Sequence, residues 1–209
     1  MVPDTGHATD VNPIDNVSYE TREKLRVYAA ELRRWQTIKS LVGPGTIDEI
    51  WTRHFADSLQ LATLATGKVW VDLGSGAGFP GLVLAICRPE TFVHLIESDG
   101  RKCAFLRHVA HAVSASVKVW DARIESALPR LDPRPEVVTA RALAPLHRLL
   151  GYSEQLLMSG ATALFPKGRD FQAELTQAAE SWRFDAEAIP SCVDPDSRIL
   201  RVRHFGGRK

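Results

Sequence analysis

In the first third of the chain, apolar residues recur at three- and four-residue spacing, which is typical of amphipathic helices. A first helix is expected to begin near Ser18, whose hydroxyl can accept a hydrogen bond from an open backbone amide. Its apolar face would carry Leu25, Tyr28, Leu32 and Trp35. The pattern therefore predicts a long helix with one side available for burial.

A break at residues 43–45, Gly-Pro-Gly, precedes the next helical segment. The following four residues have the types of a capping box, in which Thr46 caps the open amides and Glu49 reaches back. We therefore expect a second helix through Phe55 and a further helical segment near residues 59–64.

From residue 68 onward, short continuous apolar runs alternate with helical spacing. Such runs are typical of strands that are buried on both faces of a parallel sheet. The last two runs have no helix between them, so we expect them to pair antiparallel. The alternation predicts an α/β fold in which helices cover both faces of a mainly parallel sheet. The expected strands are 69–73, 91–97, 117–120, 136–140, 161–165, 184–189 and 199–205, and the expected helices are 82–87, 99–112, 146–158 and 171–181.

These patterns divide the chain into a flexible tail over residues 1–16, a helical N-terminal module over 17–66 and an α/β domain over 67–209. With 44% apolar and 24% charged residues, the composition is ordinary for a soluble protein. No apolar run approaches the about 20 residues that cross a bilayer, and residues 1–20 lack the basic residues of a targeting signal. Three separated cysteines without a CxxC pair do not suggest a disulfide framework or a zinc site. We expect a cytoplasmic protein without a metal.

Charge is balanced overall, with 26 basic and 25 acidic residues, but it is uneven along the chain. Residues 22–53 hold seven basic and four acidic residues, and the last twelve residues hold five basic residues and no acid. If these two stretches meet in the fold, they could form one face for a phosphate backbone. The alternative is that each is an ordinary solvated surface.

The most specific feature is the sequence Val-Asp-Leu-Gly-Ser-Gly-Ala-Gly-Phe-Pro-Gly over residues 71–81. It lies between an expected strand and an expected helix, where glycines allow a tight turn and the close approach of a ligand. In one register, Gly76, Gly78 and Gly81 form the GxGxxG pattern of dinucleotide-binding proteins, with Glu97 at the end of the next strand.

In the other register, Gly74, Gly76 and Gly78 follow Asp72 and form the DxGxGxG pattern of S-adenosylmethionine (SAM) methyltransferases. A dinucleotide would place its pyrophosphate at the helix N-terminus, where Asp72 would repel it and Pro80 lacks an amide. SAM has no phosphate, and its amino and sulfonium groups are cationic. This register predicts SAM, while a nicotinamide or flavin nucleotide and a purely structural turn remain alternatives.

Further segments accompany this loop in a fixed order. They are RHFADS at 53–58, ES at 97–98 with Lys102, FL at 105–106, ARIE at 122–125, TARA at 139–142 and FPKG at 165–168. Together with the glycine loop they resemble the ribosomal RNA small subunit methyltransferase G family, also called glucose-inhibited division protein B. The resemblance covers roughly residues 20–205. The RHxxDS string beside DxGSGxGFPG is specific, because unrelated SAM enzymes share only the glycines.

This resemblance implies a Rossmann-like class I SAM-dependent methyltransferase that methylates N7 of a guanine in 16S ribosomal RNA. It implies cofactor contacts from Gly74 and Phe79, an adenine-side contact from Ile124 and Glu125, and a contact from Arg141 after the fourth strand. The RNA would be met in the 30S subunit or an assembly intermediate, and we expect the enzyme to be a monomer.

The candidate site joins the glycine pattern with these implied contacts. The candidate cofactor-binding residues are Gly74, Ser75, Gly76, Gly78, Phe79, Glu97, Ile124, Glu125 and Arg141, and the candidate RNA-contacting residues are Arg53, His54 and Lys167. His54 could equally pack the helical module against the sheet, and an ion pair between the two parts is the alternative for Arg141. No catalytic residue is assigned.

Guanine N7 carries an exposed lone pair and no proton, so its methylation needs no general base. Catalysis can come from holding N7 and the methyl group in line, which explains why no Ser/His/Asp or Cys/His arrangement stands out. Ser40 departs from the family, which usually has Asn there, and this weakens any role of that amide. Three other functions remain open: a SAM methyltransferase of a small molecule or protein, a nicotinamide oxidoreductase, and a non-catalytic SAM- or RNA-binding protein.

Overall fold

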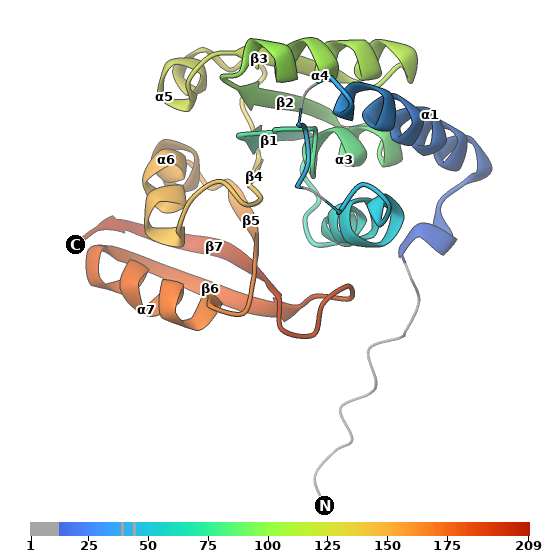
Figure 1. The fold of residues 1–209 in the computed structure, drawn as a ribbon. Helices are drawn as coiled ribbons and strands as arrows, with labels where there is room; N and C mark the ends of the chain where they lie inside the picture. Colours follow the sequence, from blue (N-terminus) through green and yellow to red (C-terminus); the bar gives the residue numbers. More distant parts are fainter. Residues whose placement is uncertain (1–12, 39, 44) are drawn as a thin grey trace, which may run out of the picture.

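A computed structural model describes residues 13–38, 40–43 and 45–209. In the described chain, a seven-stranded sheet has the order β3-β2-β1-β4-β5-β7-β6 (Figure 1). Its strands run parallel except for β7, which pairs antiparallel with both β5 and β6. The strands are β1 (Val69–Leu73), β2 (Phe92–Glu97), β3 (Val117–Asp121), β4 (Val137–Thr139), β5 (Thr162–Lys167), β6 (Trp182–Pro190) and β7 (Arg198–Arg208).

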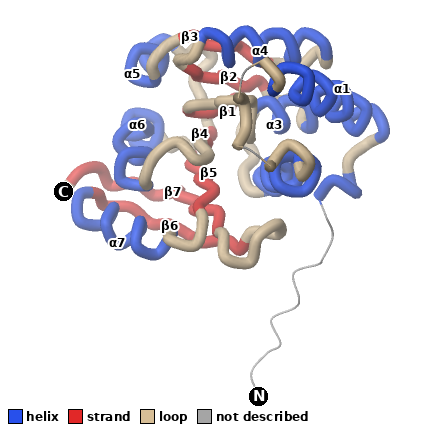
Figure 2. The backbone as a smooth tube through the Cα atoms, in the orientation of Figure 1, coloured by secondary structure: helices blue, strands red, loops and turns tan. Residues whose placement is uncertain are grey.

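Helices cover both faces of this sheet (Figure 2). On one face lie α3 and α4, with α1 packed across them, and on the other lie α5, α6 and α7. The α-helices are α1 (Tyr19–Gln36), α2 (Asp57–Leu59), α3 (Gly81–Cys87), α4 (Gly100–Ala112), α5 (Ile124–Ala127), α6 (Leu146–Met158) and α7 (Phe171–Ser181). A π-helical segment, η2 (Ile50–Ala56), precedes α2, and three 3₁₀ segments are η1 (Pro13–Asn16), η3 (Gln60–Thr63) and η4 (Leu128–Arg130).

The order of the strands creates a switch point between β1 and β4. The chain runs outward from β1 through β2 to β3, then returns to place β4 on the other side of β1. The connections that follow β1 and β4 therefore leave the sheet in opposite directions, and a crevice opens at the carboxyl ends of these strands. The glycine loop predicted at residues 71–81 lies at this point.

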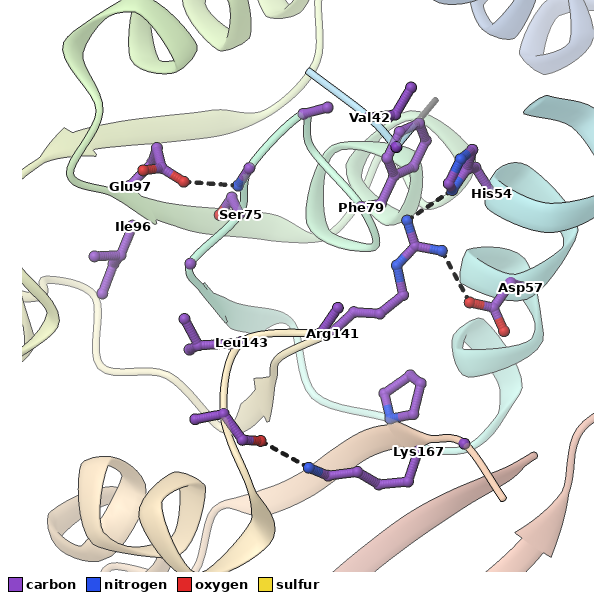
Figure 3. Close-up of a pocket in the computed structure, with 18 of the residues that line it drawn as sticks. Val42, His54, Asp57, Ser75, Phe79, Ile96, Glu97, Arg141, Leu143 and Lys167 are labelled. Carbon is purple, nitrogen blue, oxygen red and sulfur yellow. Dashed lines mark hydrogen bonds and ion pairs between the residues drawn. The ribbon is translucent and has the colours of Figure 1, made fainter. Parts of the chain in front are cut away.

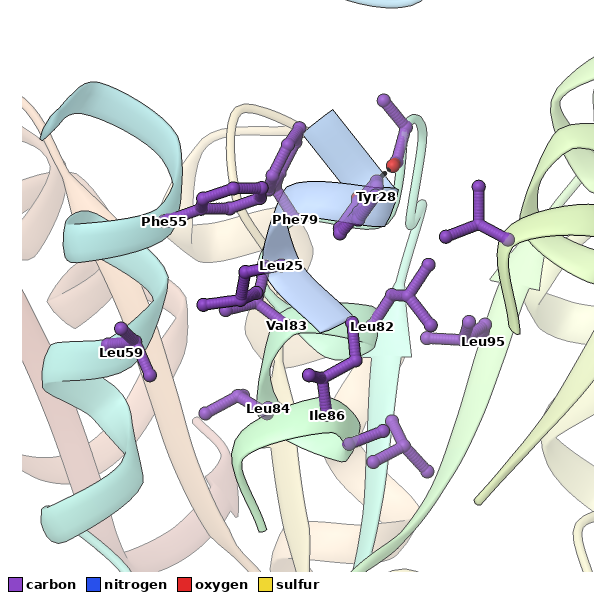
Figure 4. Packing of buried hydrophobic residues seen from close by; sticks show 14 of the residues in the cluster. Leu25, Tyr28, Phe55, Leu59, Phe79, Leu82, Val83, Leu84, Ile86 and Leu95 are labelled. Atoms are coloured by element: carbon purple, nitrogen blue, oxygen red, sulfur yellow. Dashed lines mark hydrogen bonds between the residues drawn. The ribbon is translucent and has the colours of Figure 1, made fainter. Parts of the chain in front are cut away.

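The helical module shares its hydrophobic core with the sheet. Leu25 and Tyr28 of α1 and Phe55 of η2 pack with Leu82 of α3 and Leu95 of β2 in one buried cluster (Figure 4). The buried positions of α1 recur at the spacing that predicted its apolar face. The module therefore cannot bury its apolar side without the sheet.

The sequence pattern predicted the α/β part well. The expected fold class is confirmed, and so is the antiparallel pairing of the last two strands. The bounds of β1, α6 and α7 are those expected, and the hydroxyl of Ser18 accepts a hydrogen bond from the amide of Thr21 at the start of α1.

The expected capping box at residues 46–49 is wrong. The hydroxyl of Thr46 donates to the carbonyl of Gly43, and the carboxylate of Glu49 pairs with Arg53 at 3.2 Å. The helical segment begins only at Ile50. The side chains that could have capped it are used in other contacts.

The segment expected as a flexible tail, residues 1–16, includes a short turn at its end. Residues 1–12 lie outside the described part of the chain, but Pro13–Asn16 forms the turn η1. Ile14 is buried in the core, and its carbonyl accepts a hydrogen bond from the guanidinium of Arg22 at 2.9 Å. The burial of Ile14 and this hydrogen bond together hold the turn against the helical module.

A shared core predicts that the module and the sheet unfold together. Leu25→Ala should lower the free energy of unfolding by about 2–5 kcal/mol, because Leu25 is fully buried. Val27→Ala on the same helix should change it by no more than about 0.5 kcal/mol, because Val27 is 43% exposed. Denaturant unfolding should give one transition by tryptophan fluorescence and by circular dichroism. Two separated transitions in Leu25→Ala would show that the module has a core of its own.

Candidate functional site

A cavity of about 1140 Å³ opens at the carboxyl ends of β1 and β4 (Figure 3). Its walls come from the glycine loop, the ends of β2 and β5, the loops after β3 and β4, the β6–β7 loop and the helical module. Every residue proposed from the sequence as a cofactor or RNA contact lines it except Gly78. The structure thus brings together segments that are far apart in the chain.

Three glycines of the loop have the left-handed backbone that favours glycine. Their φ angles are +65° at Gly74, +57° at Gly76 and +100° at Gly78. A Cβ at Gly78 would lie 2.5 Å from the hydroxyl of Tyr28, so this position faces the protein interior. A Cβ at Gly76 would meet only the carbonyl oxygen of Gly74, at 3.8 Å. Gly76 is therefore the bare position that faces the cavity.

The carboxylate of Glu97 holds the other side of this turn. One oxygen accepts the amide of Gly76 at 2.9 Å, and the other accepts the amides of Ser98 and Asp99, both at 2.8 Å. Glu97 is only 9% exposed, yet it lines the cavity. Its Oε2 accepts one protein hydrogen bond and keeps acceptor capacity for a hydroxyl group.

Asp72 does not face the cavity, although the sequence argument placed its charge beside a cationic ligand. It is fully buried, and its Oδ2 accepts the amide of Gly81 at 3.2 Å behind the loop. Burial raises the pKa of this carboxyl group to about 7, although that hydrogen bond acts to lower it. Asp72 supports the loop from the interior.

Phe79 connects the glycine loop to the helical module. Its ring stacks with the ring of Tyr28 at 5.4 Å between centroids and with the ring of His54 at 4.7 Å. The hydroxyl of Tyr28 also donates to the carbonyl of Ala77. Both contacts hold the loop on the side away from the sheet.

Arg141 is the centre of a polar network at the end of β4. One guanidinium nitrogen donates to Asp57 at 3.0 Å and to the carbonyl of Arg53 at 3.3 Å, and the other donates to Nδ1 of His54 at 2.9 Å (Figure 3). The guanidinium also lies 5.0 Å from the ring centroid of Phe79. The ion pair that was the alternative reading for Arg141 is present, and Arg141 also lines the cavity.

These contacts assign the protonation state of His54. Its Nδ1 faces a guanidinium, which can only donate, so Nδ1 carries no proton. Its Nε2 lies 3.1 Å from the hydroxyl of Thr46, which itself donates to a backbone carbonyl, so Nε2 carries the proton. Burial and the charges of Arg141 and Arg53 lower the pKa of His54 to about 4. His54 is neutral and packs the module against the loop.

The two candidate RNA-contacting cations, Arg53 and Lys167, differ in how exposed they are to solvent. Arg53 is exposed at the cavity wall and pairs with Glu49. The ammonium group of Lys167 lies 2.7 Å from the carboxylate of Glu174, and its side chain is only 8% exposed. Two of its three N–H donors are thus used by protein acceptors, the carbonyl of Ala144 and the carboxylate of Glu174.

The two basic stretches meet only in part. Arg53 from the first and Arg198 from the second line the same cavity. At the other end of β7, Arg208 lies against the ring of Trp182, and the ammonium of Lys209 donates to a carbonyl of α7. They do not form one continuous face.

Two candidates on the cofactor side, Ile124 and Glu125, line the cavity at the start of α5. The structural roles of Tyr28 and Asp57 were not predicted from the sequence. Helical periodicity marked Tyr28 only as a residue of the apolar face of its helix, and Asp57 was noted only as part of the RHFADS segment. The carboxylate of Asp57 accepts from Arg141 at 3.0 Å and from the side-chain amide of Gln60 at 2.8 Å. No local pattern marks a contact between residues 57 and 141.

Two features define a class I SAM-dependent methyltransferase: a sheet with an antiparallel β7 and a glycine loop at the switch point. A methyltransferase from Geobacter sulfurreducens has the same fold, with a TM-score of 0.59 and 14% identity over 86% of this chain and 88% of that one. The family described as rRNA small subunit methyltransferase G matches residues 21–200, and the chain belongs to this family.

Relatives named Ribosomal RNA small subunit methyltransferase G agree with this assignment. The relative from Methylobacterium nodulans is 52% identical over 92% of each chain. The relative from Parvibaculum lavamentivorans is 46% identical over 98% of this chain and 92% of its own length. Among the described residues, no helix is long and apolar enough to span a membrane, and no cluster of His, Cys, Asp and Glu side chains could hold a metal ion.

The lowered pKa of His54 predicts a pH-dependent stability. Between pH 4 and 6.5 the unfolded chain binds a proton at His54 that the folded chain does not, so stability should rise with pH across this window. His54→Gln removes the titration but can keep both hydrogen bonds. The difference in unfolding free energy between wild type and His54→Gln should therefore grow from pH 4 to 6.5 and be constant above pH 7. A difference that is flat from pH 4 to 8 would contradict the assignment of a neutral His54.

Proposed function

We propose that this protein transfers the methyl group of SAM to N7 of a guanine in 16S ribosomal RNA of the small ribosomal subunit. The observation that carries the proposal is the cavity, which is lined by both the glycine loop and the RHFADS segment. These two segments carry the resemblance to the family to which the chain belongs. The names of the relatives supply the substrate class.

The residues present fit SAM. Gly76 leaves room for a ligand against the backbone, and Oε2 of Glu97 can accept a hydrogen bond from a ribose hydroxyl. Ile124 offers an apolar side to the adenine ring, and the carboxylate of Glu125 can accept from its amino group. We assign these residues, with Gly74, Ser75 and Phe79, to cofactor binding. SAM would supply an activated methyl group on a sulfonium.

The chain's own contribution is positioning. Guanine N7 attacks with a lone pair and loses no proton, so no side chain has to act as a base. Arg141 fixes the loop after β4 relative to the helical module through Asp57 and His54. Rigid walls hold the two reactants in line, which can supply a large part of the rate enhancement.

Basic residues on the cavity wall support RNA as the substrate. Arg53, Lys102, Arg123 and Arg198 line the cavity from four separate segments. Among the described residues, Lys102 and Arg123 form no ion pair with an acid. A substrate with a phosphate backbone can bind such cations, and its loop bases can turn into the cavity.

The fit of SAM is tested by adding one methyl group to the bare glycine. Gly76→Ala should weaken SAM binding about tenfold or more, because the new Cβ occupies ligand space, and should cost about 1–2 kcal/mol of stability. Gly160→Ala is the matched control, because its φ is +93° and a Cβ there meets nothing within 4 Å, away from this cavity. Calorimetry should show SAM affinity lost only in Gly76→Ala. Equal affinity in both variants would remove the glycine loop from the cofactor site.

The reaction is tested with labelled SAM on 30S subunits and on deproteinised 16S RNA, both from cells that lack this gene. Wild type and Gly160→Ala should label one guanine, which aniline cleavage of reduced RNA then locates as N7-methylguanine, whereas Gly76→Ala should not. Labelling of one substrate alone identifies the state of the RNA that is used. No labelling of either substrate, with SAM binding intact, would overturn the proposal and favour a small-molecule methyltransferase or a non-catalytic protein.

A further inference from the structure

The loop after β4 is closed by a ring of three polar contacts. The ammonium of Lys167, at the end of β5, donates to the carbonyl of Ala144 at 2.8 Å and to Oε2 of Glu174 at 2.7 Å. The same Oε2 accepts the amide of Leu146, the first residue of α6, at 2.6 Å. The ion pair between Lys167 and Glu174 thus fixes the carbonyl of Ala144 and the amide of Leu146, two residues apart in the chain.

Pro145 explains why this ring is needed. It precedes α6 as the N-cap residue and has no side chain that can cap the helix. The carboxylate of Glu174, from α7, takes the place of a cap and stabilises the positive end of α6. We call Lys167 and Glu174 the clamp.

The clamp and Arg141 hold the loop from its two ends. Between them, Ala142 has a φ of +53°, which is unfavourable for a residue with a side chain. Leu143 follows, lines the cavity and is 37% exposed. A Cβ at Gly74 would lie 2.6 Å from its Cδ1, so Leu143 packs directly over the glycine loop (Figure 3). A strained segment held at both ends places an apolar side chain in the cavity.

We propose that Lys167 and Glu174 are positioning residues, which clamp the loop after β4 so that Leu143 forms the apolar wall against which the target base is held for methyl transfer. This rests on the proposed function. It replaces the expectation that Lys167 contacts RNA. A buried ammonium with two protein acceptors has little capacity left for a phosphate, whereas it fixes the loop at the point where the two reactants would meet.

The test compares Lys167→Met, Glu174→Ala and the double variant with wild type. Each should lower kcat by about 100-fold and leave SAM affinity within about a factor of three, because the loop moves while Gly76, Glu97 and Glu125, assigned above to SAM, make no contact with the clamp. The double variant should be no worse than the more severe single one, since both break one ring. Glu174→Gln should recover part of kcat, because its amide oxygen can still accept from Leu146. Glu180→Ala, on the exposed side of the same helix, is the matched control.

The salt dependence of RNA binding separates the clamp from a phosphate contact. If Lys167 acts only in the clamp, Lys167→Met should leave the slope of log RNA affinity against log salt concentration unchanged. If Lys167 contacts a phosphate, the variant should reduce the magnitude of that slope by about 1. A reduced slope, or a wild-type kcat in Glu174→Ala, would overturn the proposal.

Hydrogen exchange tests the clamp without relying on the proposed reaction. The amide of Leu146 should exchange faster in Glu174→Ala than in Glu180→Ala with no RNA present. If wild type labels no ribosomal substrate but this difference is found, the proposed reaction fails and the clamp on the loop stands. If the difference is absent, the clamp fails whatever the enzyme methylates.

Discussion

The stacking of Phe79 with Tyr28 and His54 is the contact on which the rest of the site depends. A glycine loop that receives a ligand must stay bare on the side of the ligand, so it can be held only from behind. Phe79 gives the loop one large side chain on its protected side, and that ring meets α1 through Tyr28 and the RHFADS segment through His54. The burial of Phe79 therefore joins the helical module to the cofactor side of the sheet.

Two carboxyl groups complete the support of the loop, and they lie in different surroundings. Glu97 accepts three backbone amides at the rim of the cavity. Asp72 is buried behind the loop with one hydrogen bond from Gly81, and burial raises its pKa to about 7. A carboxyl group thus organises backbone amides at the rim of the cavity, whereas in the interior a carboxyl group supports the loop from behind and its charged form is disfavoured by burial.

Local patterns predicted the elements, because strand and helix periodicity depend on residues near in sequence. They placed the glycine loop and the ends of β1, α6 and α7 correctly. The capping box failed because the hydroxyl of Thr46 is used by His54 and Gly43, a tertiary demand that no local rule contains. Lys167 was placed correctly at a strand end, but nothing in the sequence marks Glu174, in the following helix, as its partner. The network of Arg141 joins residues more than 80 positions apart, and only the fold reveals it.

The pairing of cations inside the cavity is consistent with methylation of a purine nitrogen. In the proposed reaction, positive charge moves from the sulfonium of the donor to the guanine, so an unpaired cation that lies closer to the guanine than to the sulfonium would oppose the transfer. Arg141 and Lys167 are each paired with a carboxylate, at 3.0 Å and 2.7 Å. The cations that can attract a phosphate backbone, such as Arg123, lie on other segments of the cavity wall. In the proposed function, attraction of the RNA and transfer of the methyl group thus make opposite demands on charge, to which paired and unpaired cations on different segments of the cavity wall are suited.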